Sequence, residues 1–230
     1  YIAVVSRTQI DIVDAATSQV LNTFAPISHG WEGAIWNPTG TLLGFANDNR
    51  FEIWQNPESP SLATNVVNFE FDILNYRNSS WHPNGDIIAL GFSGFIEFWS
   101  VSTGEILSVI EATASPEGSI IMELTWNSTG EQLAVARRTG HVEVRDSLSS
   151  EKLLTIYQQP YLDAEGFFVN PAAYAVDWSR NNEAIAYATK RDVQVIFFSE
   201  VPSDTMFISS EFDSYIRKFI GHTDNILTID

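Results

Sequence analysis

The sequence predicts an all-β chain built from repeated four-stranded antiparallel sheets, on three observations. A Trp-containing turn recurs as WNPTG at Trp36, WHPNG at Trp81, WNSTG at Trp126 and WSRNN at Trp178, at spacings of 45, 45 and 52 residues. Short apolar segments follow each turn in a fixed register, and no segment shows a convincing helical period. Gly, Asn, Pro, Ser and Thr separate these segments, as expected of tight turns between strands.

The first segment after each turn is apolar throughout and predicts a strand buried on both faces. Bulky residues lie seven and nine positions after the Trp, and small residues lie eight and ten positions after it. These positions hold Leu43, Gly44, Phe45 and Ala46; Ile88, Ala89, Leu90 and Gly91; Leu133, Ala134, Val135 and Ala136; and Ile185, Ala186, Tyr187 and Ala188.

A second segment, about eighteen residues after each Trp, alternates apolar residues with Glu or Gln. The four copies are Phe51–Trp54, Ile96–Trp99, Val142–Arg145 and Val193–Ile196. This alternation predicts a strand with one partly solvated face. A short strand follows after a turn, as at Ile106–Ile110 and Leu153–Ile156, so that each repeat supplies four short strands.

A four-stranded sheet of this length cannot bury its faces alone, so we expect successive sheets to stack around an axis as the blades of a β-propeller. We expect one propeller domain over residues 1–230. Its blades are expected at about 1–26, 27–70, 71–113, 114–159 and 160–220, with 221–230 as the first strand of a further or ring-closing blade.

The repeat resembles the WD-repeat β-propellers along the whole chain, in degenerate form. The Gly-His pair of that family occurs as Gly221-His222. Its Trp-Asp pair has counterparts in Trp54-Gln55, Trp99-Ser100, Arg145-Asp146 and Val13-Asp14. The hydrogen-bonded His, Ser/Thr, Asp and Trp tetrad of the family is complete in no repeat.

Two arrangements are open for the five visible blades. In one, the strand at 225–229 closes a five-bladed ring by pairing with Ile2–Val5. In the other, the chain is a window of a larger ring, which in this family most often has seven blades.

Composition limits the function. With 29 acidic and 12 basic residues the formal charge is −17, which repels nucleic-acid phosphates over most of the surface, so no nucleic-acid partner is expected. No apolar run approaches the roughly 20 residues of a membrane helix, so we expect a soluble chain without a membrane partner. The absence of Cys excludes disulfides and thiol catalysis. It fixes no compartment, although we slightly favour the cytoplasm.

No recognisable motif predicts catalysis. His29, His82, His141 and His222 form no metal-binding spacing, and the sequence has no nucleophile elbow, phosphate-binding Gly loop or paired-carboxylate motif. We therefore expect no catalytic residue, metal or cofactor. The Asn-x-Ser/Thr sequences at Asn78 and Asn127 are expected to serve as turn residues.

Half of the basic residues lie in the loops expected between the second and third strands. They are Arg7, Arg50, Arg137, Arg138, Lys190 and Arg191. The inter-blade loops supply acids, at Asp72, Glu111, Glu117, Asp163, Glu165 and Asp224. Two interpretations follow: the bases pair with these loop acids, or they form a ring that binds an acidic or phosphorylated segment of a protein partner.

The resemblance implies a non-catalytic protein–protein interaction scaffold whose partners dock on the loop face. A propeller hydrolase or lyase, with residues converging on the central channel, is the alternative. Carbohydrate binding is a third possibility and would need exposed aromatic side chains on one face.

Overall fold

The computed structural model describes most of the chain. The described residues are 1–6, 8–24, 33–47, 50–70, 76–111, 120–147, 149–157, 161–162, 166, 168–169, 172–189, 192–201, 207–209 and 216–220. They form strands and turns, and their one helical segment is a 3-10 turn at Phe198–Glu200. The all-β class and the antiparallel four-stranded sheets predicted from the repeat are confirmed.

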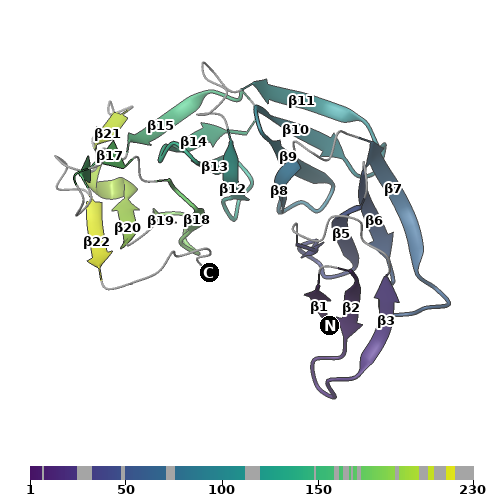
Figure 1. Ribbon diagram of the computed structural model, residues 1–230. Coiled ribbons are helices and arrows are strands. Elements are labelled where there is room, and N and C mark those ends of the chain that lie inside the picture. Colours follow the sequence, from purple (N-terminus) through teal and green to yellow (C-terminus); the bar gives the residue numbers. More distant parts are fainter. Residues whose placement is uncertain are drawn as a thin grey trace. The chain divides into compact units, whose positions relative to one another are not determined.

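Two compact units divide the chain, one of Tyr1–Leu90 with Phe98–Ser108 and the other of Gly91–Glu97 with Val109–Asp230. The first sheets along the chain are antiparallel meanders, and Figure 1 labels all of their strands except β4. Sheet 1 contains β1 (Ile2–Val5), β2 (Ile10–Val13) and β3 (Val20–Phe24). Sheet 2 contains β4 (Ile35–Trp36), β5 (Leu42–Asn47), β6 (Arg50–Gln55) and β7 (Thr64–Glu70). Sheet 3 contains β8 (Tyr76–Trp81), β9 (Ile87–Phe92), β10 (Phe95–Ser100) and β11 (Ile106–Glu111).

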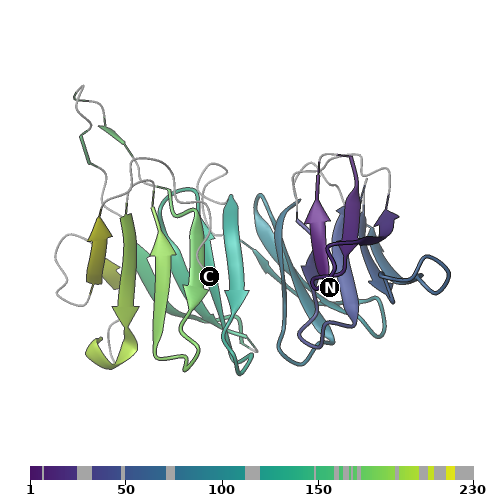
Figure 2. The same ribbon diagram turned by 90° about the horizontal axis from the view of Figure 1, so that it is seen from below.

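Of the later sheets, sheet 4 adds a fifth, parallel strand to the meander, whereas sheet 5 has four strands. Sheet 4 contains β12 (Ile121–Trp126), β13 (Gln132–Arg137), β14 (Val142–Asp146), β15 (Lys152–Tyr157) and β21 (Phe207–Ser209). Sheet 5 contains β18 (Ala175–Trp178), β19 (Ala184–Ala188), β20 (Asp192–Phe197) and β22 (Ile216–Ile220), whose alternating directions are visible in Figure 2. A separate hairpin pairs β16 (Tyr161–Leu162) with β17 (Phe168–Val169).

The Trp turns share one backbone geometry. The fifth residue of each has a positive φ, at Gly40 (68°), Gly85 (79°), Gly130 (76°) and Asn182 (59°). Its N–H donates to the carbonyl of the residue after the Trp, as from Gly40 to Asn37 at 2.9 Å and from Asn182 to Ser179 at 2.8 Å. Asn is among the few non-Gly residues that adopt this conformation readily, which is why WSRNN forms the same turn as WNPTG.

The strand after each turn is buried on both faces, as its apolar sequence predicts. Leu43, Phe45, Ile88, Leu133 and Tyr187 are each at most 2% exposed. Ala89, Ala134, Ala136 and Ala188 are also buried, whereas Ala186 is partly exposed.

The prediction that the alternating Glu and Gln lie on a partly solvated face is wrong at three of the four copies; at the fourth, Glu97 is partly exposed, as expected. Glu52 and Glu143 are each 4% exposed and Gln194 is 2% exposed. Each lies opposite a buried residue of the preceding strand: Glu52 opposite Phe45, and Gln194 opposite Tyr187. Neighbouring side chains form hydrogen bonds with these polar groups; the Tyr187 hydroxyl, for example, donates to Gln194 Oε1 at 2.5 Å. Burial therefore leaves none of the three side chains without a hydrogen-bond partner.

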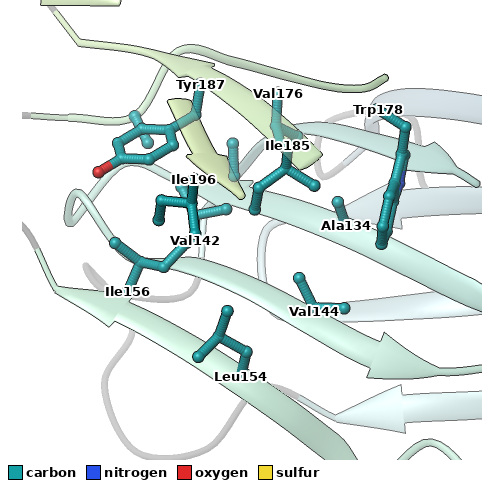
Figure 3. Close-up of a cluster of buried hydrophobic side chains, with 12 residues drawn as sticks. Ala134, Val142, Val144, Leu154, Ile156, Val176, Trp178, Ile185, Tyr187 and Ile196 are labelled. Atoms are coloured by element: carbon teal, nitrogen blue, oxygen red, sulfur yellow. The ribbon is translucent and has the colours of Figure 1, made fainter. Parts of the chain in front are cut away.

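Within each unit, consecutive sheets pack face to face. In the N-terminal unit, Ile10 and Ile12 of sheet 1 pack against Leu43 and Phe45 of sheet 2. In the C-terminal unit, sheet 4 supplies Ala134, Ala136, Val142, Val144, Leu154 and Ile156 to the core, and sheet 5 supplies Val176, Trp178, Ile185, Tyr187 and Ile196 (Figure 3). Burial of these two apolar faces is the main source of stability for the pair.

Polar contacts also join sheets 4 and 5. The Val176 N–H donates to Glu123 Oε2 at 3.0 Å, and the Trp178 indole Nε1 donates to the Thr125 carbonyl at 3.1 Å. At the turns, Asn182 Nδ2 donates to Ser128 Oγ at 2.8 Å, and the Ser128 N–H donates to Asn182 Oδ1 at 2.9 Å. These contacts fix how the two sheets pack against each other.

Candidate partner-binding surface

The structure places three of the six basic residues expected to bind a partner. Arg50 begins β6, Arg137 ends β13, and Arg138 follows it in the turn to β14. Arg7, Lys190 and Arg191 lie outside the described residues. Arg50 belongs to the N-terminal unit, and Arg137 and Arg138 belong to the C-terminal unit.

Arg50 is paired along its own strand. Its Nε donates to Glu52 Oε1 at 2.8 Å, while the Trp54 indole Nε1 donates to Glu52 Oε2 at 2.8 Å. Residues two apart lie on the same face of a strand, which brings all three side chains together on β6. Both carboxylate oxygens of the buried Glu52 are therefore engaged, whereas the Arg50 side chain remains 42% exposed.

Arg137 belongs to a cluster of three bases around Glu143. Glu143 Oε2 accepts from Arg137 Nη2 at 3.2 Å and from Arg145 Nε at 2.9 Å, and Glu143 Oε1 lies 2.9 Å from Lys152 Nζ. The side chains of Arg137, Glu143 and Arg145 are 5–6% exposed. Lys152, at 33%, is the cluster's contact with solvent. We call these four residues the Glu143 cluster.

The Glu143 cluster keeps its carboxylate ionised. Burial alone would raise the pKa of Glu143, but Arg137, Arg145 and Lys152 outweigh burial and lower the pKa to about 2. Nearby, burial lowers the pKa of His141, whose ring packs edge-on against Tyr157 at a centroid distance of 4.6 Å. At neutral pH the cluster holds three cations and one anion.

These ion pairs differ from those expected from the sequence. In one of the two interpretations, the bases pair with inter-blade loop acids. Of these acids only Glu111 is described; Asp72, Glu117, Asp163, Glu165 and Asp224 lie outside the described residues. In the part of the chain that the structure describes, Arg50 and Arg137 pair instead with the strand acids Glu52 and Glu143. Glu recurs at the same position of three repeats, at Glu52, Glu97 and Glu143. This recurrence was the available signal, and interpreting these residues as solvated concealed the pairing at Glu52 and Glu143.

Arg138 remains at the surface. Its backbone N–H donates to the Ile120 carbonyl at 3.0 Å, which fixes the turn, and the residue is exposed. Among the described residues, no ion pair involves its guanidinium, whose pairing geometry suits carboxylate and phosphate groups. Of the three described members of the predicted set, Arg138 is the exposed one, whereas Arg50 and Arg137 are held in ion pairs.

The histidines and sequon residues occupy structural positions where they are described. His82 Nδ1 accepts from the Asn84 N–H at 3.0 Å in its turn. Asn127 is 3% exposed, and its Oδ1 accepts from the Gln132 N–H at 3.1 Å, so it closes a turn, as expected. The same expectation is wrong for Asn78, which lies within strand β8. His29 and His222 lie outside the described residues.

The described ranges hold neither a candidate metal-binding cluster nor a membrane-spanning helix. No group of three or more His, Cys, Asp or Glu side chains there could hold a metal ion. The same residues include no helix with the length and apolar character needed to span a bilayer.

Comparison with known proteins identifies no relative: no protein-family model matches the chain, and no curated protein matches its sequence. The WD-repeat resemblance therefore depends on the repeat within this chain.

Proposed function

We propose that the chain is a WD-repeat-like β-propeller that acts as a non-catalytic scaffold for a protein partner. The observation that carries the proposal is the repeated antiparallel sheet, packed face to face on the next sheet within each unit. Stacking of this kind, continued through successive repeats, generates a ring whose loops are held by rigid sheets. The propeller arrangement would be tested directly by a crystal structure.

The partner docks an acidic or phosphorylated segment at the β13–β14 turn, where Arg138 is exposed. Arg137, directly before it, is committed to Glu143 and holds the turn in place. One exposed guanidinium gives a modest contribution in water, so the turn is one contact among several on the loop face.

A charge reversal tests this docking. Binding of fluorescent acidic and phosphorylated peptide pools is measured by anisotropy for the unmodified protein, for Arg138→Glu and for Arg180→Glu. Arg180 is an exposed base in the Trp turn between β18 and β19. The Trp turns join the first and second strands of a sheet, whereas Arg138 lies in a turn between the second and third strands. We expect Arg138→Glu to weaken binding and Arg180→Glu to leave it unchanged.

Unchanged binding in Arg138→Glu would contradict the proposed docking position. A loss confined to Arg180→Glu would transfer the docking surface to the Trp-turn end. Thermal melting of both variants separates these outcomes from unfolding.

A further inference from the structure

Two Trp residues pack on the preceding sheet in the same way. In the C-terminal unit, Trp178 donates from Nε1 to the Thr125 carbonyl at 3.1 Å and lies beside Ala134 (Figure 3). In the N-terminal unit, Trp81 donates from Nε1 to the Ile35 carbonyl at 3.4 Å. A Cβ placed on Gly44 would lie 3.7 Å from Trp81 Cζ2, which puts that indole over a small residue.

The receiving positions are equivalent in the two sheets. Ile35 and Thr125 each directly precede the Trp of their own sheet, and each is paired with the small residue below the indole: Ile35 with Gly44, and Thr125 with Ala134. An indole is thus held by a small residue that admits the ring and a carbonyl that accepts its N–H. A carbonyl oxygen has two lone pairs, so it can accept this bond in addition to one within the sheet.

Sheet 5 has the same kind of receiving site on the face opposite the one that packs against sheet 4. Asp177 directly precedes Trp178 and is paired with Ala186. A pocket of about 520 Å³ opens there, lined among the described residues by Asp177, Trp178, Ser179, Arg180, Ala184, Ile185, Ala186 and Val195. We call it the Ala186 pocket.

The exposure of the pocket residues shows what a covering group would bury. Ala134 is 0% exposed and Val144 is 2% exposed beneath sheet 5. Their counterparts Ala186 and Val195 are partly exposed. An indole seated on Ala186 would bury this apolar floor in the way that Trp178 buries Ala134, and that burial supplies the favourable free energy of binding.

We infer that the Ala186 pocket binds the indole of a tryptophan that a partner protein presents at the end of a β-strand, with the indole N–H donating to the Asp177 carbonyl. The small floor and the carbonyl acceptor both match the two sites already filled within this chain. The pocket lies on a sheet face, away from the Arg138 turn, so this inference goes beyond the proposed docking of an acidic segment and does not depend on it.

A peptide copying Ile120–Gly130, the chain's own strand and Trp turn, is the probe. The peptide carries 5-fluorotryptophan at the position of Trp126 and is titrated with the 230-residue protein, while its fluorine resonance is followed by NMR. We expect a saturable change of chemical shift. A peptide with Phe at that position, measured as a competitor, is expected to bind at least about fivefold more weakly because it lacks the indole N–H.

Ala186→Leu tests the location, because its added side chain fills the pocket floor. We expect it to weaken peptide binding at least about tenfold, whereas Ser199→Leu, which adds the same side chain at an exposed position outside the pocket, leaves binding within about twofold. Arg138→Glu should also leave it unchanged, which separates this site from the proposed loop-face docking. Melting curves of the variants confirm folding.

Three results would overturn the inference: no saturable shift with the unmodified protein, equal binding by Ala186→Leu, or equal binding of the Trp and Phe peptides. The first two would remove the site. The third would remove its selectivity for the indole N–H.

Discussion

At the residue scale, Glu143 is the carboxylate that neutralises the three basic side chains of its cluster. Replacing it with Gln leaves Arg137, Arg145 and Lys152 without their shared anion while preserving its shape. Because removing one partner of a buried ion pair leaves uncompensated charge, we expect Glu143→Gln to lower the free energy of unfolding by about 3 to 5 kcal/mol at pH 7. Urea denaturation measures this, with the exposed Glu105→Gln as a control.

The same carboxylate predicts an acid-side pH dependence. Its pKa is about 2 in the folded protein and ordinarily 4.5, so its stabilisation is complete above pH 4.5 and is lost as pH falls towards 2. The stability difference between the unmodified protein and Glu143→Gln should shrink over that range. A difference that stays constant from pH 6 to pH 3 would contradict the lowered pKa.

Glu123 predicts the opposite dependence. Burial and the nearby Asp177 raise its pKa to about 7, although the Val176 N–H opposes them. Since the folded state binds this proton more tightly than the unfolded state, stability falls as pH rises from 4.5 to 7. We expect Glu123→Gln to exceed the unmodified protein in stability by on the order of 1 to 2 kcal/mol at pH 8, and the gain to diminish towards pH 5. A gain independent of pH would argue against this titration.

Trp36 provides a matched comparison with Trp178. Among the described residues, the Trp36 Nε1 is the buried side-chain polar atom without a hydrogen-bond partner. Trp81 donates to a carbonyl of β4 in the preceding sheet. The three described strands of sheet 1 include no counterpart of β4 that could supply such a carbonyl to Trp36. Trp178→Phe loses a hydrogen bond and Trp36→Phe does not. We therefore expect Trp178→Phe to cost about 1 to 2 kcal/mol more in chemical denaturation. Equal costs would mean that the Trp36 N–H is satisfied in solution.

At the element scale, the strands were predictable where local patterning determines them. The apolar segments after each Trp became β5, β9, β13 and β19, and these strands are buried on both faces as expected, apart from the partly exposed Ala186 of β19. The solvation of Glu52 and Glu143 was mispredicted because alternation shows which residues share a face and does not show what covers that face. The partners of Arg50 and Arg137 could not be inferred for the same reason.

The parallel pairing of β21 with β15 had no signal in the sequence. Thr155, Ile156 and Tyr157 pair with Phe207, Ile208 and Ser209, which lie in the excursion between β20 and β22. The pairing depends on where that excursion meets a neighbouring sheet, and no local pattern encodes such a contact.

Trp178 is the element-scale anchor between sheets 4 and 5. It is 9% exposed and contacts both the apolar core and the Thr125 carbonyl. Trp178→Ala should cost about 3 to 5 kcal/mol, measured by urea denaturation. A loss below about 1 kcal/mol would contradict its role in joining the sheets.

At the scale of the whole molecule, the β15–β21 pairing affects the order in which the chain can fold during synthesis. β21 emerges from the ribosome only after β18, β19 and β20, so the outer edge of β15 stays open until the following sheet has been made. An open edge can pair with other chains, and N-terminal segments generally fold first as they emerge. The C-terminal unit must therefore pass through a stage in which sheet 4 is formed but unprotected, and slow translation of residues between β15 and β21 would prolong its exposure to misassembly.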